Sequence, residues 1–138
     1  MSIRTITHTF AVYIHFISLK TMIIPQELDY LLDAVQSGLR SVQRGFDQYQ
    51  QGYFTERSGE FFCLELNEEA GELANLEKKR WKGKPISDEE LADEAADVFI
   101  TLFNYANARH INLSEAVHKK LITIEHRRQE LEQRDEKY

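Results

Sequence analysis

Apolar residues between positions 25 and 52 recur every three or four residues, the spacing that gathers side chains on one face of an α-helix. Pro25 suits the first turn of such a helix, and Gly52 suits its end. The apolar series consists of Leu28, Leu31, Leu32, Val35, Leu39, Val42 and Phe46. The pattern therefore predicts a first helix from Pro25 to about Gly52.

A cap and a break delimit a second helix. The Ser58 side chain can accept a hydrogen bond from an amide of a first helical turn. The run Lys82-Gly83-Lys84-Pro85 contains the two residue types that most strongly interrupt helices. A second helix is therefore predicted from Ser58 to about Trp81.

Two further helices follow the break. Ser87-Asp88-Glu89-Glu90 has the form of a capping box, which predicts a third helix from this point to about Arg109. Asn112 is a favoured N-cap residue and opens a fourth helix. The end of that helix, from Arg127 onward, is strongly charged and is expected to fray. The four predicted helices indicate an all-α fold.

The middle of the third predicted helix is apolar on nearly every side. Its apolar residues are Val98, Phe99, Ile100, Leu102 and Phe103. A helix of this kind is buried on several faces, which a four-helix unit of this size does not provide by itself. We therefore expect a subunit interface, and a homodimer or homotetramer rather than a monomer.

Residues 1–22 are interpreted as an N-terminal extension, and residues 23–138 as one helical domain. Alternating apolar residues in the extension (Phe10, Val12, Ile14 and Phe16) are typical of a strand, yet no second strand is expected beside it. The other interpretation is that translation starts at Met22, in which case the extension would not belong to the protein. The longest apolar stretch, from Phe10 to Leu19, is too short to cross a membrane.

Composition narrows the possible function. The 138 residues carry a formal net charge of −6, which argues against a protein that binds nucleic acid by neutralising its phosphates. The single cysteine, Cys63, excludes an internal disulfide and fits a reducing compartment, so a cytoplasmic location is expected.

Two acidic motifs are the strongest chemical signal. Glu68-Glu69-Ala70-Gly71-Glu72 lies in the second predicted helix, and Glu94-Ala95-Ala96-Asp97 lies in the third. Helical spacing gathers carboxylates on one side of each helix, among apolar residues rather than opposite them. The two groups are Glu65, Glu68, Glu69 and Glu72 on one helix, and Glu90, Glu94 and Asp97 on the other.

Carboxylates held close together near a core repel one another and lose hydration, so they require a compensating cation. Oxygen ligands of this kind suit Mg²⁺, with Mn²⁺ as a possible substitute. The alternative is an exposed acidic face supported by lysines. Because the same placement occurs on two helices, we favour the metal site. Such a site could hydrolyse a phosphoanhydride, with a spare carboxylate accepting the proton of water.

The two-part motif, with its surroundings from Leu66 to Leu73 and from Leu91 to Val98, resembles the signature of the MazG-like all-α nucleoside triphosphate pyrophosphohydrolases. The resemblance implies a four-helix unit that forms an oligomer and a Mg²⁺-dependent hydrolysis of nucleoside triphosphates to monophosphate and pyrophosphate. It implies noncanonical or deoxynucleotides among the possible substrates. It also implies metal ligands at Glu69, Glu72, Glu94 and Asp97, and catalytic roles for Glu68 and Glu69.

The same resemblance suggests substrate-binding residues. Lys120 and Arg127 on the fourth helix match two members of a phosphate-binding set, whereas Ile124 stands where the third, polar member is expected. The alternative for both cations is a solvated position beside the helix seam. Tyr105 shares a face with Asp97 and could line a nucleotide pocket, and Trp81 could stack on a base. Packing is the alternative for each of these aromatic residues.

Two other functional classes remain open. A non-catalytic helical dimer that binds a nucleotide or a protein would explain the departure at Ile124. A ferritin-like oxidase is suggested by Glu115-x-x-His118, but that fold requires the pattern on two helices and the chain has it once.

Overall fold

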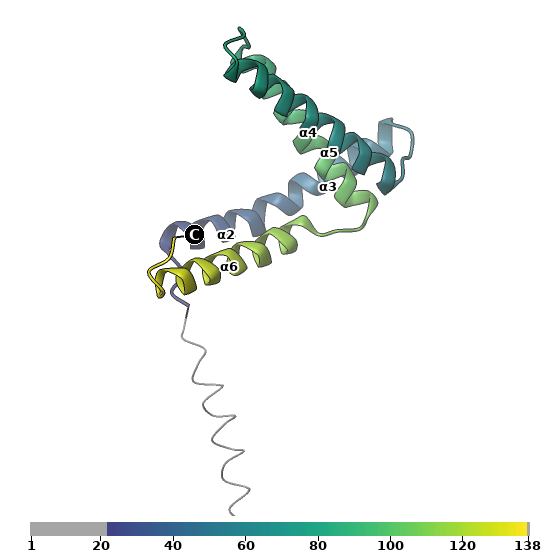
Figure 1. Cartoon of the computed structure of the whole chain (residues 1–138). Coiled ribbons are helices and arrows are strands. Elements are labelled where there is room, and N and C mark those ends of the chain that lie inside the picture. The colour runs from purple at the N-terminus through teal and green to yellow at the C-terminus, as the bar shows by residue number, and fades with distance from the viewer. Residues whose placement is uncertain (1–21, 138) are drawn as a thin grey trace, which may run out of the picture.

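The computed structural model describes residues 22–137, all of whose regular structure is helical (Figure 1). The first helical run consists of α2 (Gln26–Ala34), the π-helical segment η1 (Val35–Leu39) and α3 (Arg40–Tyr53). It is followed by α4 (Gly59–Trp81), α5 (Asp88–Ala108) and α6 (Leu113–Glu132). The predicted all-α fold is confirmed, and no helix among the described residues is long and apolar enough to cross a membrane.

The helices form two antiparallel pairs. α4 and α5 pack along each other as a hairpin, and α6 packs on α2, η1 and α3. The hairpin extends away from the other pair, and the two pairs meet where α3 contacts α5 (Figure 1). Long faces of α4 and α5 are therefore not covered by other helices of the same chain.

Side-chain caps begin the three later helices. Ser58 Oγ accepts a hydrogen bond of 3.3 Å from the Phe61 amide at the start of α4. The α5 capping box is complete: the Glu90 amide donates to Ser87 Oγ at 3.2 Å, and the Ser87 amide donates to Glu90 Oε2 at 2.8 Å. Asn112 Oδ1 accepts from the Glu115 amide at 3.3 Å to begin α6. These are the capping residues predicted from the sequence.

The π-helical turn was not predicted. It falls where α6 packs on the first helical run, and Ser114 Oγ donates a hydrogen bond of 3.2 Å to the Val35 carbonyl. In a π turn the backbone hydrogen bonds join residues i and i+5 instead of i and i+4. Beyond the π turn, Gln43 Oε1 accepts a hydrogen bond of 3.0 Å from the Leu113 amide, and Gln43 Nε2 donates one of 2.7 Å to the Ile111 carbonyl. These contacts hold the α5–α6 turn against α3.

The core lies at the junction of the two helix pairs. Phe103 is 1% exposed, and its ring centroid lies 5.2 Å from that of Phe46 and 4.6 Å from that of Phe99. Among the described residues the other buried hydrophobic side chains are Leu32, Phe62 and Ala106. This is a small core for a domain of this length, and it leaves many large apolar side chains exposed.

The charged end of α6 remains helical as far as Glu132. Glu125 is buried and accepts hydrogen bonds from Arg128 (2.7 and 2.8 Å) and from Gln129 (2.7 Å). Gln129 also donates to the Ile23 carbonyl at 2.6 Å, which attaches the segment preceding α2 to α6. The bonds from Arg128 hold the Glu125 pKa down at about 2 in spite of burial.

This network predicts a loss of stability in acid. The Glu125 pKa rises from about 2 in the folded chain toward its ordinary value of 4.5 on unfolding. The contribution of Glu125 to the free energy of unfolding is therefore fully present above pH 4.5 and is lost as the pH falls toward 2. In chemical denaturation between pH 6 and 2.5, Glu125→Gln should lower the unfolding free energy at pH 6 and weaken its fall in acid. An unchanged pH profile would contradict this role.

The helix ends agree with the sequence-based predictions to within one residue, Trp81 being the end of α4 in both. The strand-like alternation between Phe10 and Phe16, and nearly all of the proposed extension, lie outside the described residues.

Candidate metal and phosphate site

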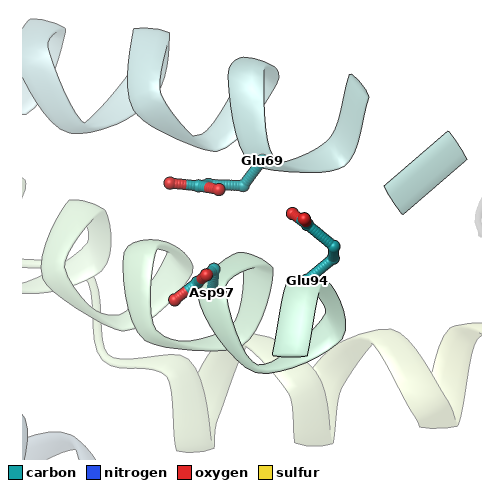
Figure 2. A group of neighbouring side chains, drawn as sticks. All are labelled: Glu69, Glu94 and Asp97. Atoms are coloured by element: carbon teal, nitrogen blue, oxygen red, sulfur yellow. The ribbon is translucent and has the colours of Figure 1, made fainter. Parts of the chain in front are cut away.

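Three carboxylates converge between the helices of the hairpin. Glu69 projects from α4, and Glu94 and Asp97 project from α5, with their carboxyl groups turned into the space between the two helices (Figure 2). One oxygen from each lies within 4.8 Å of one from each of the others. Glu69 and Glu94 are half-buried, whereas Asp97 is exposed. We refer to Glu69, Glu94 and Asp97 as the carboxylate trio.

Burial and mutual repulsion raise two pKa values in the trio. The Glu69 pKa lies above 4.5 because the side chain is desolvated, and because Asp97, Glu72 and Glu94 repel its charge. The Glu94 pKa is raised by desolvation and then by the proximity of Glu72 and Asp97. The main causes of both shifts are burial and neighbouring carboxylates. No ion pair among the described residues involves a carboxylate of the trio.

The geometry of the trio fits a small divalent cation. Mg²⁺ binds oxygen at about 2.1 Å, so ligand oxygens on opposite sides of the ion lie about 4.2 Å apart. One oxygen from each residue of the trio lies within 4.8 Å of the others, which is close to the span of an ion bound in this way. Three carboxylates leave further coordination positions of an octahedral ion for water and phosphate oxygens.

The other predicted acidic residues lie at different distances from the trio. Glu72 is exposed but close enough to influence Glu69 and Glu94. Glu68 is also exposed and is not among the groups that shift either pKa. Glu90 is not part of the trio, and its carboxylate accepts hydrogen bonds from Ser87 in the α5 capping box.

The predicted substrate-binding residues are dispersed within one chain. Lys120 and Arg127 are exposed on α6, which packs on the first helical run and not on the hairpin. Trp81 is 85% exposed at the end of α4. Tyr105 is half-buried and lies near Arg109, two turns beyond Asp97 on α5. None of these four residues is among the main causes of the raised pKa values of Glu69 and Glu94.

Glu115, from the Glu115-x-x-His118 pattern, forms hydrogen bonds within the protein and is not part of the trio. Glu115 accepts hydrogen bonds from Asn112 (2.7 Å) and Arg40 (3.4 Å). Within residues 22–137 the trio is the group of side chains that could hold a metal, and it includes neither Glu115 nor His118.

The chain was compared with protein-family models, with curated proteins and with solved structures, and none of the three comparisons gave a significant match.

Proposed function

We propose that the chain is a Mg²⁺-dependent nucleoside triphosphate pyrophosphohydrolase. The observation that supports this proposal most directly is the carboxylate trio, in which three acidic groups from two helices converge and none forms an ion pair among the described residues. The resemblance of the two acidic motifs to the MazG-like signature supplies the substrate class. Bound Mg²⁺ would neutralise the polyphosphate and make a coordinated water more acidic.

The protein's own groups have two tasks in this reaction. Asp97 and one of the two glutamates hold the cation. The second glutamate accepts the proton as water attacks the α-phosphorus and the bond to the bridging oxygen breaks, which releases monophosphate and pyrophosphate. A raised pKa makes Glu69 and Glu94 better proton acceptors near neutral pH than an ordinary carboxylate.

The experiment that tests this function is pyrophosphate release from a panel of ribo- and deoxyribonucleoside triphosphates, with Mg²⁺ or Mn²⁺. Release that requires the metal and the intact trio would support the proposal. Metal-dependent nucleotide binding without turnover would instead favour the non-catalytic binding protein. Neither binding nor turnover by folded protein would reject both functions.

The proposed active form is a homodimer or a higher oligomer. Phe99, Ile100 and Leu102 on α5 are 47%, 38% and 37% exposed, although their neighbour Phe103 is buried in the core. Leu64 on α4 is 72% exposed. Adjacent exposed apolar side chains of this size are typical of a subunit interface.

Replacing one of these residues by a charge should separate the subunits. In Ile100→Glu the carboxylate would have to be buried without a partner, so sedimentation or light scattering should show a shift toward the mass of one chain. Tyr30→Glu, at a side chain that is 78% exposed on α2, is the matched control and should leave the mass unchanged. A wild-type protein that is monomeric at micromolar concentration would contradict the proposed interface.

A further inference from the structure

A cavity lies where the two helix pairs meet. Its volume is about 740 Å³, within the range of small-molecule sites. It is lined by the end of α3, the connection that follows it, the start of α4 and the end of α5. The core residue Phe62 and the more exposed Phe54 supply apolar surface on its wall.

The cavity continues the face on which the carboxylates lie. Phe62 precedes Glu69 on α4 by seven residues, and Asn104 follows Asp97 on α5 by seven. Seven residues are nearly two helical turns, so each pair shares a face at a separation of about 10 Å. Because α4 and α5 are antiparallel, both steps lead from the trio toward the same end of the hairpin. The ribose and base of a nucleotide bound through its phosphates extend over a distance of this order.

The charges on the cavity wall do not favour a second phosphate site. Two arginines face three carboxylates, the charged lining residues being Arg57, Arg109, Asp47, Glu56 and Glu60. Arg109 is already paired with Glu60 at 2.6 Å and lies directly against Gly59, where a Cβ would overlap its guanidinium. With no surplus of positive charge, the cavity suits a neutral polar group with apolar faces.

One amide on the wall has an unused hydrogen-bonding group. Gln50 donates to the Thr55 carbonyl, Gln51 to Asp47, and Asn107 to the Gln43 carbonyl. Asn104 also lines the cavity, and its buried Oδ1 has no partner within residues 22–137. A buried acceptor without a donor is unfavourable, and rotation of the amide presents either its oxygen or its nitrogen to a ligand.

We propose that this cavity holds the nucleobase of the substrate and that Asn104 is the specificity-determining residue that reads the base edge. The inference rests on the proposed function, because the trio positions the phosphates. A carboxamide pairs with adjacent donor and acceptor groups, the arrangement on the hydrogen-bonding edge of a nucleobase. Phe54 and Phe62 would contact the faces of the ring.

The test compares the wild type with Asn104→Ala, Asn104→Asp and the control Gln36→Ala, all as full-length protein. For each, kcat/KM is measured with ATP, GTP, CTP and UTP and with the four deoxynucleotides. Asn104→Ala should reduce kcat/KM for the preferred base by roughly 10- to 100-fold and reduce it less for the others, so that discrimination is lost. Gln36→Ala, at an exposed amide that lies outside the cavity wall, should stay within about twofold of the wild type.

Asn104→Asp keeps the shape of the side chain but only accepts hydrogen bonds when ionised. It should shift preference toward the bases with an exocyclic amino group, namely adenine, cytosine and guanine, over uracil and thymine. This variant also protects the test against misfolding caused by the smaller alanine. Unchanged base ranking in both variants, with hydrolysis intact, would overturn the inference and leave the proposed function standing.

A binding measurement separates the two proposals. Free nucleosides lack phosphates, so their binding to metal-free protein, followed by NMR of the side-chain amides, does not require the trio. If nucleosides bind in a way that depends on Asn104, but no triphosphate is hydrolysed, the result would support the cavity as a nucleobase site and reject the proposed function. Absence of both nucleoside binding and base discrimination would overturn the inference.

Discussion

Glu69→Gln is expected to abolish metal-dependent pyrophosphate release. Glu69 is the carboxylate that α4 contributes to the trio, so its loss leaves only the two α5 ligands. Changes at groups that merely support a metal ligand reduce affinity or activity by 10- to 100-fold. Loss of a direct ligand or proton acceptor should therefore lower kcat by at least about 100-fold. The measurement is initial-rate pyrophosphate release at saturating nucleotide and Mg²⁺.

Glu77→Gln is the matched control, since Glu77 is exposed on the same helix and lies outside the trio. It should retain wild-type activity. Equal activity of Glu69→Gln and the wild type would remove the trio from the mechanism.

Stability provides a second readout of Glu69→Gln that does not depend on turnover. Because the folded-state pKa of Glu69 lies above 4.5, the metal-free folded chain holds more protons than the unfolded chain just above that pH. The unfolding free energy therefore falls as the pH rises through this window and stays lower at neutral pH. Glu69→Gln should be more stable than the wild type at pH 7 without metal, and Mg²⁺ should stabilise the wild type more than the variant.

Phe103→Ala should give the largest loss of stability of the single substitutions considered. Phe103 is 1% exposed and packs against Phe46 and Phe99 where the two helix pairs meet. Truncating a buried phenylalanine lowers the free energy of unfolding by about 3–5 kcal/mol, and few other buried side chains are present to compensate. Thermal unfolding followed by circular dichroism should show a Tm lower by roughly 15 °C.

Tyr30→Ala removes an aromatic ring of similar size from a position that is 78% exposed. Its effect should stay within about 0.5 kcal/mol, as for most surface substitutions. A loss at Phe103 no larger than at Tyr30 would show that the junction is not the core of the protein.

The sequence predicted the helices well because their ends depend on local chemistry. Ser58, Ser87 and Asn112 each satisfy amides within their own first turn, so the capping pattern is sufficient to place the helix starts. The π turn could not be predicted in this way. It occurs where α6 packs against the first helical run, and Ser114 lies 79 residues from its partner Val35.

The acidic site was predicted in part. Helical spacing correctly brought Glu94 and Asp97 to one face, and the second motif supplied Glu69. The same rule also grouped Glu90 and Glu68 with these carboxylates. In the structure the Glu90 carboxylate accepts a hydrogen bond from Ser87, and Glu68 is exposed and lies outside the trio. The sequence did not single out Asn104, since its unpaired oxygen is visible only once the helices have packed around the cavity.

The sequence by itself determined the helix content, the helix ends and the two acidic motifs, because hydrogen bonds and periodicity within a few residues decide these features. Tertiary structure alone decided which carboxylates converge, which amide remains unpaired and which apolar side chains stay exposed. Each of these depends on the approach of segments that are distant in the chain. For Glu69 and Asp97, separated by 28 residues of hairpin, only the packing of α4 on α5 brings the two charges together.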